Sequence, residues 1–127
     1  MHIGTDIVHV PGFAEQLDSP GSRFTAVFTD RELRTCKDKP NRAASLAGRW
    51  AAKEAYIKAW SQSLYGSPPA ISPEDVNFAE IEVVPDAFGR VALVLRGRIA
   101  RHGPAAVSLS ISHDADYAVA VCLIASS

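Results

Sequence analysis

Apolar and polar residues alternate near the start of the chain, as they do in a β-strand with two different faces. In residues 3–8, one face carries Ile3, Thr5 and Ile7, and the other carries Gly4, Asp6 and Val8. The pattern predicts a short strand. An aspartate at the centre of such a strand is uncommon, because its short carboxylate competes for backbone hydrogen bonds.

The second half of the chain contains four further runs that are typical of strands. Residues 81–84 and 91–95 are rich in aliphatic residues, and the loop between them predicts a hairpin. Residues 107–113 alternate between apolar residues and serines, and residues 117–124 follow after a three-residue turn. This short connection predicts that the last two strands also pair as a hairpin. Residues 97–102, between the two hairpins, are predicted to form a short helix.

Three helices are predicted in the first half. Pro11 suits the first turn of a helix that reaches about residue 17. Thr29 and Glu32 have the spacing of a capping box, so a short helix should follow to about residue 36. A long helix is predicted for residues 42–61. Together with the strands it indicates an α+β fold, with an antiparallel sheet packed on one long helix.

Length and composition place the chain among ordinary globular proteins. Its 127 residues predict a single domain, residues 1–127, and the proline-rich stretch 67–73 is interpreted as a connection within it. A net charge of −1 and the lack of any run near ~20 apolar residues argue against nucleic-acid or membrane binding. The start of the chain lacks the features of a secretory signal, so we expect a cytoplasmic location. The two cysteines, Cys36 and Cys122, lack metal-ligand spacing and are expected to be free.

At ~100° per residue the long helix has three distinct sides. The first is an apolar stripe, the second carries small residues, and the third carries two alanines beside a carboxylate and an ammonium. The apolar stripe consists of Leu46, Trp50 and Ile57, and the small-residue side consists of Gly48, Ala52, Ala55 and Ala59. The third side consists of Ala47, Ala51, Glu54 and Lys58. Glu54 and Lys58 can also be interpreted as an exposed i,i+4 ion pair, which stabilises a helix by only about 0.2–0.5 kcal/mol.

Asp6 and Glu54 together predict a magnesium site. Magnesium prefers oxygen ligands and typically takes one or two carboxylates, with waters and substrate phosphates completing its shell. Cysteine and histidine are too sparse and scattered for a zinc site. The alternative interpretation places Asp6 on a solvent-exposed face of its strand.

Three further residues are candidates for a binding site. Arg49 and Lys53 border the apolar stripe of the long helix and supply positive charge. His113 ends its strand in phase with Leu109 and Ile111. A histidine at this position can be a hydrogen-bonded core residue or can reach the mouth of a pocket, and both interpretations remain open.

Four segments, spread over nearly the whole chain, occur in the same order as in a known protein family. They are residues 4–8 (Gly-Thr-Asp-Ile-Val), 28–33 (Phe-Thr-Asp-Arg-Glu-Leu), 46–55 (Leu-Ala-Gly-Arg-Trp-Ala-Ala-Lys-Glu-Ala) with Lys58 and Ala59, and 107–113 (Val-Ser-Leu-Ser-Ile-Ser-His). Together they resemble the small holo-acyl-carrier-protein synthases of the phosphopantetheinyl transferase superfamily. The segment in the long helix is the most specific of the four.

The resemblance implies a reaction. Such enzymes transfer 4′-phosphopantetheine from coenzyme A to a serine of an apo acyl carrier protein, release adenosine 3′,5′-bisphosphate and support fatty acid biosynthesis. It implies that Asp6 and Glu54 bind Mg²⁺ at the pyrophosphate and that Lys58 lies at the phosphates. It places Arg49 and His113 on the nucleotide side of coenzyme A.

Further expectations accompany this resemblance. Lys53, next to Glu54, is also expected to bind coenzyme A, and Glu54 or a water that it orients is the first choice as general base. A deprotonated Lys58 is a weaker candidate, because a nearby pyrophosphate favours the charged ammonium. The small members are homotrimers with sites shared between neighbouring chains. Val8 stands where the larger branch of the superfamily has a third carboxylate, so a water is expected there.

Two stretches depart from the family pattern. Residues 10–18 contain two acids and no cation, whereas many relatives carry basic residues there that meet an acidic free-standing carrier. We therefore hypothesise weak electrostatic steering and a carrier domain inside a large multifunctional synthase as substrate. Only Gly66 remains of a glycine-rich loop after the long helix, so the loop at residues 60–72 is expected to take another path.

Two other functions compete with transfer. A magnesium-dependent nucleotide pyrophosphohydrolase would use the same two carboxylates without a protein substrate, although such hydrolases usually carry denser carboxylate clusters on one helix. A non-catalytic oligomeric binding domain would need neither magnesium nor coenzyme A.

Overall fold

The computed structural model describes residues 1–125, which form five strands, four α-helices and three short 3₁₀ helices. In chain order these are β1 (His2–His9), α1 (Val10–Asp18), η1 (Phe24–Val27), α2 (Asp30–Lys37), α3 (Arg42–Ser63), η2 (Pro73–Asp75), η3 (Phe78–Glu80), β2 (Ile81–Pro85), β3 (Val91–Leu95), α4 (Gly97–His102), β4 (Val107–Asp114) and β5 (Tyr117–Ile124).

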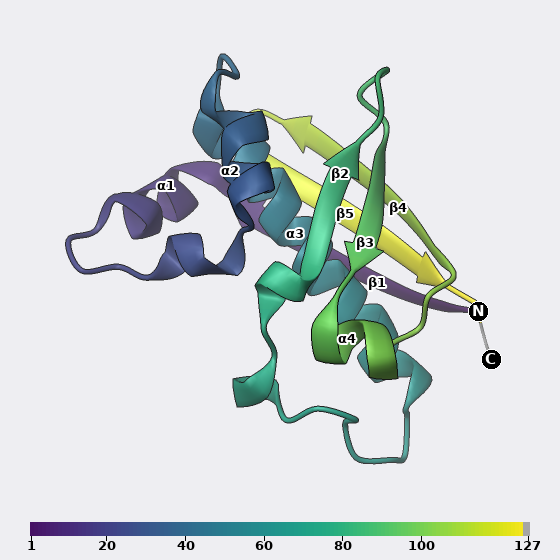
Figure 1. Cartoon of the computed structure of the whole chain (residues 1–127). Coiled ribbons are helices and arrows are strands. Elements are labelled where there is room, and N and C mark those ends of the chain that lie inside the picture. Colours follow the sequence, from purple (N-terminus) through teal and green to yellow (C-terminus); the bar gives the residue numbers. More distant parts are fainter. Residues whose placement is uncertain (126–127) are drawn as a thin grey trace.

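The strands form two antiparallel sheets (Figure 1). The larger has the order β1-β5-β4, so the last strand lies at its centre, and Asp6 of β1 is paired with Ala120 of β5. The smaller is the β2–β3 hairpin, in which Ile81 pairs with Leu95. Both predicted hairpins are therefore confirmed.

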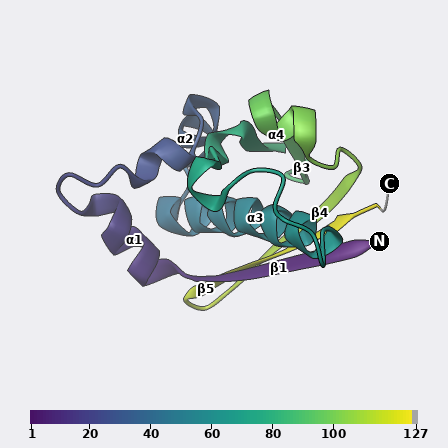
Figure 2. The same ribbon diagram turned by 90° about the horizontal axis from the view of Figure 1, so that it is seen from below.

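Helix α3 is the middle layer of the molecule. Figure 2 shows it between the three-stranded sheet on one side and α2, α4 and the β2–β3 hairpin on the other. Because both sides are covered, much of the helix is buried, including Leu46, Ala52 and Tyr56. The predicted fold, an antiparallel sheet packed on one long helix, is confirmed.

The small-residue side of α3 explains how closely β1 approaches it. A Cβ atom at Gly4 would overlap the carbonyl oxygen of Ala55 and lie 2.5 Å from the nitrogen of Ala59. Strand and helix backbones are therefore in direct contact, which only glycine permits at this position. The contact fixes the face of β1 that carries Asp6 against α3.

Most predicted boundaries agree with the structure to within one or two residues. The capping box is present: the Thr29 hydroxyl accepts from the backbone N–H of Glu32, and the Glu32 carboxylate accepts from that of Thr29. Helix α3 continues to Ser63, two residues beyond the prediction, and the three 3₁₀ helices were not predicted. Cys36 and Cys122 are free and buried, as expected.

The outer face of the larger sheet is mainly apolar on β1 and β5, whereas β4 contributes three exposed serines to it, Ser108, Ser110 and Ser112. Ile3 and Ile7 of the edge strand β1 are 57% and 64% exposed, and half-buried Val121 and Leu123 of β5 lie beside β1 on the same face.

Among residues 1–125, no helix is long and apolar enough to cross a membrane.

Candidate active site

Asp6 and Lys58 form the centre of the candidate site. The Asp6 side chain is 8% exposed, and its Oδ1 accepts a hydrogen bond from Lys58 Nζ at 2.9 Å. Its Oδ2 is buried and has no partner among the described residues. An unsatisfied buried carboxylate oxygen is costly, so this atom is a candidate ligand for a cation. The alternative that Asp6 lies on an exposed strand face is wrong.

Glu54 faces the same carboxylate from α3. Its pKa is raised from 4.5 to about 7, first by burial and then by the hydrogen bond and charge of Asp6, while Lys58 opposes the shift. The pKa of Lys58 is raised as well, mainly by the hydrogen bond that Lys58 donates to Asp6 and further by the charges of Asp6 and Glu54, while desolvation opposes the shift. The buried Asp6 and the half-buried Glu54 repel each other when both are ionised, and a divalent cation would relieve that repulsion.

A cleft of about 300 Å³ opens beside Glu54. It lies between β1, α1 and α3, and its lining includes Val8, Gln16, Trp50 and Glu54. The catalytic carboxylate expected from the sequence is thus accessible from outside, with a wall of apolar and aromatic side chains on one side.

Arg49 and His113 line a second cleft of about 300 Å³, together with Lys39 and Ser45. The Arg49 side chain is buried; its guanidinium donates to the Ser45 carbonyl at 3.2 Å, and its Nε has no partner among residues 1–125. His113 Nε2 lies 2.8 Å from the Ala44 carbonyl oxygen. Three basic side chains around one cleft make it suitable for an anion.

Gly48 allows His113 to reach this cleft. A Cβ atom there would lie 2.9 Å from His113 Nε2 and 3.0 Å from Ile111 Cγ2, both closer than side chains normally approach. The histidine is therefore both hydrogen-bonded to α3 and exposed at the mouth of a pocket, so the two interpretations left open by the sequence hold together.

The two clefts share no lining residue. The cleft at Glu54 lies on the β1 and α1 side of α3, whereas the cleft at Arg49 is closed by β4 and the tip of the β2–β3 hairpin. The structure brings Asp6, Glu54 and Lys58 together, and it brings Arg49 and His113 together, but it keeps the two groups apart within one chain.

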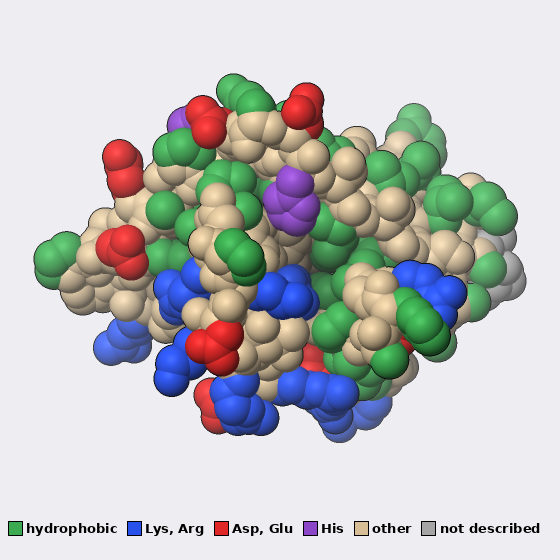
Figure 3. Space-filling model, turned by 90° about the horizontal axis from the view of Figure 1, so that it is seen from above, with side chains coloured by type: hydrophobic (Ala, Val, Ile, Leu, Met, Phe, Trp, Pro, Cys, Tyr) green, Lys and Arg blue, Asp and Glu red, His purple; other side chains and the backbone are tan. Residues whose placement is uncertain are grey.

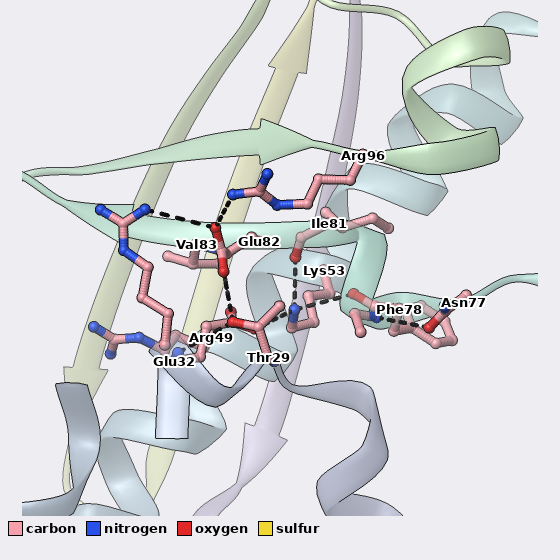
Figure 4. Close-up of polar contacts among 12 residues, drawn as sticks. Thr29, Glu32, Arg49, Lys53, Asn77, Phe78, Ile81, Glu82, Val83 and Arg96 are labelled. Atoms are coloured by element: carbon pink, nitrogen blue, oxygen red, sulfur yellow. Dashed lines mark hydrogen bonds and ion pairs between the residues drawn. The ribbon is translucent and has the colours of Figure 1, made fainter. Parts of the chain in front are cut away.

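Lys53 lies with neither group, which corrects the expectation that it binds coenzyme A. Its side chain is fully buried, and Nζ donates to Glu32 Oε1 at 2.8 Å, to the Phe78 carbonyl at 3.0 Å and to the Ile81 carbonyl at 2.6 Å (Figure 4). An ammonium has three hydrogens, so none remains for a phosphate. Burial lowers the pKa of Lys53, and the charge of Glu32 opposes that shift.

Glu32 and Glu82 are polar residues of this region that sequence reasoning missed. Beyond the capping box, Glu32 accepts from the Val83 backbone N–H at 3.0 Å, and it is 1% exposed. Glu82 accepts from Thr29 at 2.6 Å and from Arg96 at 2.8 Å (Figure 4). The capping box marked Glu32, but nothing local in the sequence pairs it with a lysine 21 residues later.

The raised pKa of Glu54 predicts a pH effect on stability in the absence of divalent cations. Between pH 4.5 and about 7, the folded state keeps a proton that the unfolded state has lost. The contribution of this group to the free energy of unfolding therefore falls as pH rises through that window. Thermal unfolding measured across the window should show this loss in the wild type and a flatter profile in Glu54→Gln. Glu15→Gln, which changes an exposed acid, is the control and should keep the wild-type profile. If Glu54→Gln also kept the wild-type profile, the prediction would be contradicted.

Comparison with known proteins shows to which family the chain is similar. The profile of the 4′-phosphopantetheinyl transferase superfamily matches residues 2–122. A holo-[acyl-carrier-protein] synthase of Corynebacterium efficiens is 53% identical over 129 residues, which cover 96% of this chain and 92% of the relative.

Solved structures extend the likeness to the fold. The Chronobacterium ammoniagenes ACPS–CoA complex is 55% identical, with a TM-score of 0.93, over 99% of this chain and 97% of that chain. The acyl carrier protein synthase of Mycobacterium tuberculosis is 38% identical, with a TM-score of 0.81, over 99% and 97%.

Proposed function

The chain belongs to the 4′-phosphopantetheinyl transferase superfamily and to its holo-[acyl-carrier-protein] synthase type, and we propose that it transfers 4′-phosphopantetheine from coenzyme A to a serine of an apo acyl carrier protein or carrier domain. Adenosine 3′,5′-bisphosphate is the second product. The observation that carries the proposal is the convergence of Asp6 and Lys58 with Glu54, which lines a cleft, and the Asp6 Oδ2 atom that has no partner among the described residues.

Asp6 and Glu54 suit Mg²⁺ as its protein ligands. They offer hard carboxylate oxygens, one of them unsatisfied, in the number that magnesium usually takes from a protein when phosphates and waters supply the rest. When bound there, Mg²⁺ would neutralise charge on the pyrophosphate of coenzyme A. The described residues contain no group of three or more acids, histidines or cysteines that could hold a metal, and Val8 adds no ligand.

The remaining groups act on the phosphates and the serine hydroxyl. Lys58 keeps its proton, because both neighbouring acids raise its pKa, so it contributes a positive charge where negative charge develops in the transition state. Glu54 has a pKa near 7 and is suited to accept the proton of the attacking serine hydroxyl, directly or through an oriented water. The apolar wall at Trp50 limits the access of competing water.

Arg49, His113 and Lys39 suit the nucleotide half of coenzyme A. They line one cleft. The Nε of the buried Arg49 guanidinium is a hydrogen-bond donor without a partner among the described residues, so it is available to donate to a phosphate oxygen. Since this cleft is separate from the one at Glu54 in the same chain, we propose that a complete site combines the two clefts from neighbouring chains of a homotrimer.

The outer face of the β1-β5-β4 sheet is the surface that we assign to this assembly. Exposed Ile3 and Ile7 on the edge strand β1, beside the partly exposed Val121 and Leu123 of β5, favour association. Val121→Asp, at the centre of this face, should therefore give a monomer in sedimentation and lower transfer activity. Ala92→Asp, exposed on β3, is the matched control. A Val121→Asp variant that sediments like the wild type would contradict the assignment.

Product analysis tests the proposed reaction. Adenosine 3′,5′-bisphosphate should appear only when coenzyme A, Mg²⁺ and an apo carrier are all present. Release of free phosphopantetheine without a carrier would favour a pyrophosphohydrolase, and the absence of both reaction and Mg²⁺-dependent binding would favour a non-catalytic binding domain. We further propose that the enzyme acts in the cytoplasm and serves fatty acid biosynthesis.

A further inference from the structure

His9 lines the cleft at Glu54, yet the proposed reaction gives it no part. It is the last residue of β1 and the N-cap of α1, and its side chain is exposed. Glu54 in the same cleft is half-buried. His9 therefore stands nearer the rim, where a molecule that approaches Glu54 from outside would pass.

The first turn of α1 fixes the orientation of the His9 ring. Its Nδ1 accepts a hydrogen bond from the backbone N–H of Gly12 at 3.3 Å, and the ring packs against Tyr117, with ring centres 5.5 Å apart. A ring nitrogen that accepts an N–H carries no hydrogen of its own, so the hydrogen of the neutral ring lies on Nε2. Nε2 has no hydrogen-bond partner among residues 1–125, and it is therefore a donor available to a ligand.

Histidine is an unusual choice for the cap alone. Asparagine, aspartate and serine cap helices best, because their short side chains reach the N–H groups of the first turn directly. A residue that serves the local structure less well than these, at the rim of a candidate active site, is typical of a position with a binding role.

Gln16 of α1 gives this rim a second neutral hydrogen-bonding group. Its side chain is exposed and lines the same cleft, seven residues after His9. Two turns of helix separate the two positions by about 10 Å along the axis, and buried Phe13 forms an apolar floor between them. About three residues of an extended peptide span that distance, whereas a single phosphate group does not.

The rim offers these hydrogen bonds without positive charge. Helix α1 carries Glu15 and Asp18 and no cation. Lys and Arg side chains gather on the face of the molecule that Figure 3 shows, and they belong to other elements. Charge at the rim therefore does not attract an acidic partner, and recognition there depends on short-range contacts.

Resting on the proposed function, we propose that His9 and Gln16 hydrogen-bond the peptide backbone that flanks the acceptor serine of the carrier, and so hold the serine hydroxyl toward Glu54. Peptide carbonyls suit the Nε2–H of His9 and the amide N–H of Gln16, and the Gln16 amide oxygen can also accept a backbone N–H. Such bonds between neutral groups depend little on ionic strength, which fits the weak electrostatic steering hypothesised from the sequence.

The double variant His9→Asn/Gln16→Leu tests this contact in the full chain. Asparagine still caps α1 but is too short to present a donor where the imidazole does, and leucine keeps much of the size of glutamine without its amide. The KM for the carrier should rise about tenfold, because two hydrogen bonds are lost, while the KM for coenzyme A and the melting temperature stay near those of the wild type. The ratio of variant to wild-type KM for the carrier should be the same at about 50 and about 300 mM salt. His102→Asn/Gln62→Leu, which changes an exposed histidine and an exposed glutamine elsewhere, is the matched control and should keep the wild-type KM values.

Three results would overturn this proposal. The first is an unchanged KM for the carrier in the folded double variant. The second is a rise confined to the KM for coenzyme A, which would assign the two side chains to the amides of the pantetheine arm. The third is a wild-type KM for the carrier that rises steeply with salt, which would assign carrier recognition to charged groups.

A single variant covers the case in which the double variant does not fold. Gln16→Leu alone changes an exposed side chain and should raise the KM for the carrier about threefold, and an unchanged KM would again overturn the proposal. If the wild type modifies no carrier at all, the proposed function itself fails, which is distinct from each of these outcomes.

Discussion

Glu54→Gln is expected to lower kcat/KM for phosphopantetheine transfer by about 10³-fold or more, because a metal and the charge it neutralises contribute several kcal/mol to such transition states. The amide is nearly isosteric, so α3 should keep its structure. It can neither bind magnesium as a carboxylate does nor accept the serine proton. Steady-state kinetics with an apo carrier and near-saturating Mg²⁺ measure the loss.

The control for this result is Glu15→Gln, which removes an exposed acid from α1. Asp6→Asn should produce a loss comparable to that of Glu54→Gln, since Asp6 supplies the unpartnered oxygen. A Glu54→Gln enzyme within tenfold of the wild type would show that this carboxylate is not at the reacting centre.

Lys53→Met is expected to lower the free energy of unfolding by about 3–5 kcal/mol, because it leaves the carboxylate of Glu32 buried without its charged partner. The two side chains are 0% exposed and joined at 2.8 Å. Lys53 also holds two backbone carbonyls, at Phe78 and Ile81, against α3. Denaturant unfolding measures the change, and the melting temperature should fall by about 10 °C or more.

The exposed pair of Arg90 and Asp86 provides the comparison. Arg90→Met should leave the free energy of unfolding close to that of the wild type, since this i,i+4 pair lies in solvent. Lys53→Met/Glu32→Leu should recover only part of the loss, because Glu32 also accepts from two backbone N–H groups. At temperatures where Lys53→Met is folded, its KM for coenzyme A should remain near that of the wild type. A large rise would instead restore Lys53 to the coenzyme A site.

Local patterns predicted the elements of this fold well. The alternation in β1, the capping box at Thr29 and the helical periodicity of α3 each depend on neighbouring residues, so they can be read from sequence. The same patterns, together with the family resemblance, pointed to Asp6, Glu54 and Lys58, and the structure places these three side chains together.

Burial and long-range pairing could not be predicted in the same way. On a helical projection Lys53 lies at the flank of α3, but whether that flank meets solvent or the β2–β3 hairpin depends on tertiary packing. Its partner Glu32 comes from another helix, and of its two carbonyl acceptors Ile81 begins a predicted strand whereas Phe78 lies in a stretch for which the sequence predicted no element. The separation of Arg49 from Glu54 likewise depends on which elements cover each side of α3.

The central claim is that Asp6 and Glu54 hold the metal at which phosphopantetheine is transferred to a carrier. The most direct test is the mass of an apo carrier after incubation with coenzyme A, Mg²⁺ and this protein. The account predicts a gain of one phosphopantetheine that disappears in Glu54→Gln and after chelation of the metal. A gain that persists in both cases, or none with any carrier despite a folded protein that binds coenzyme A, would contradict it.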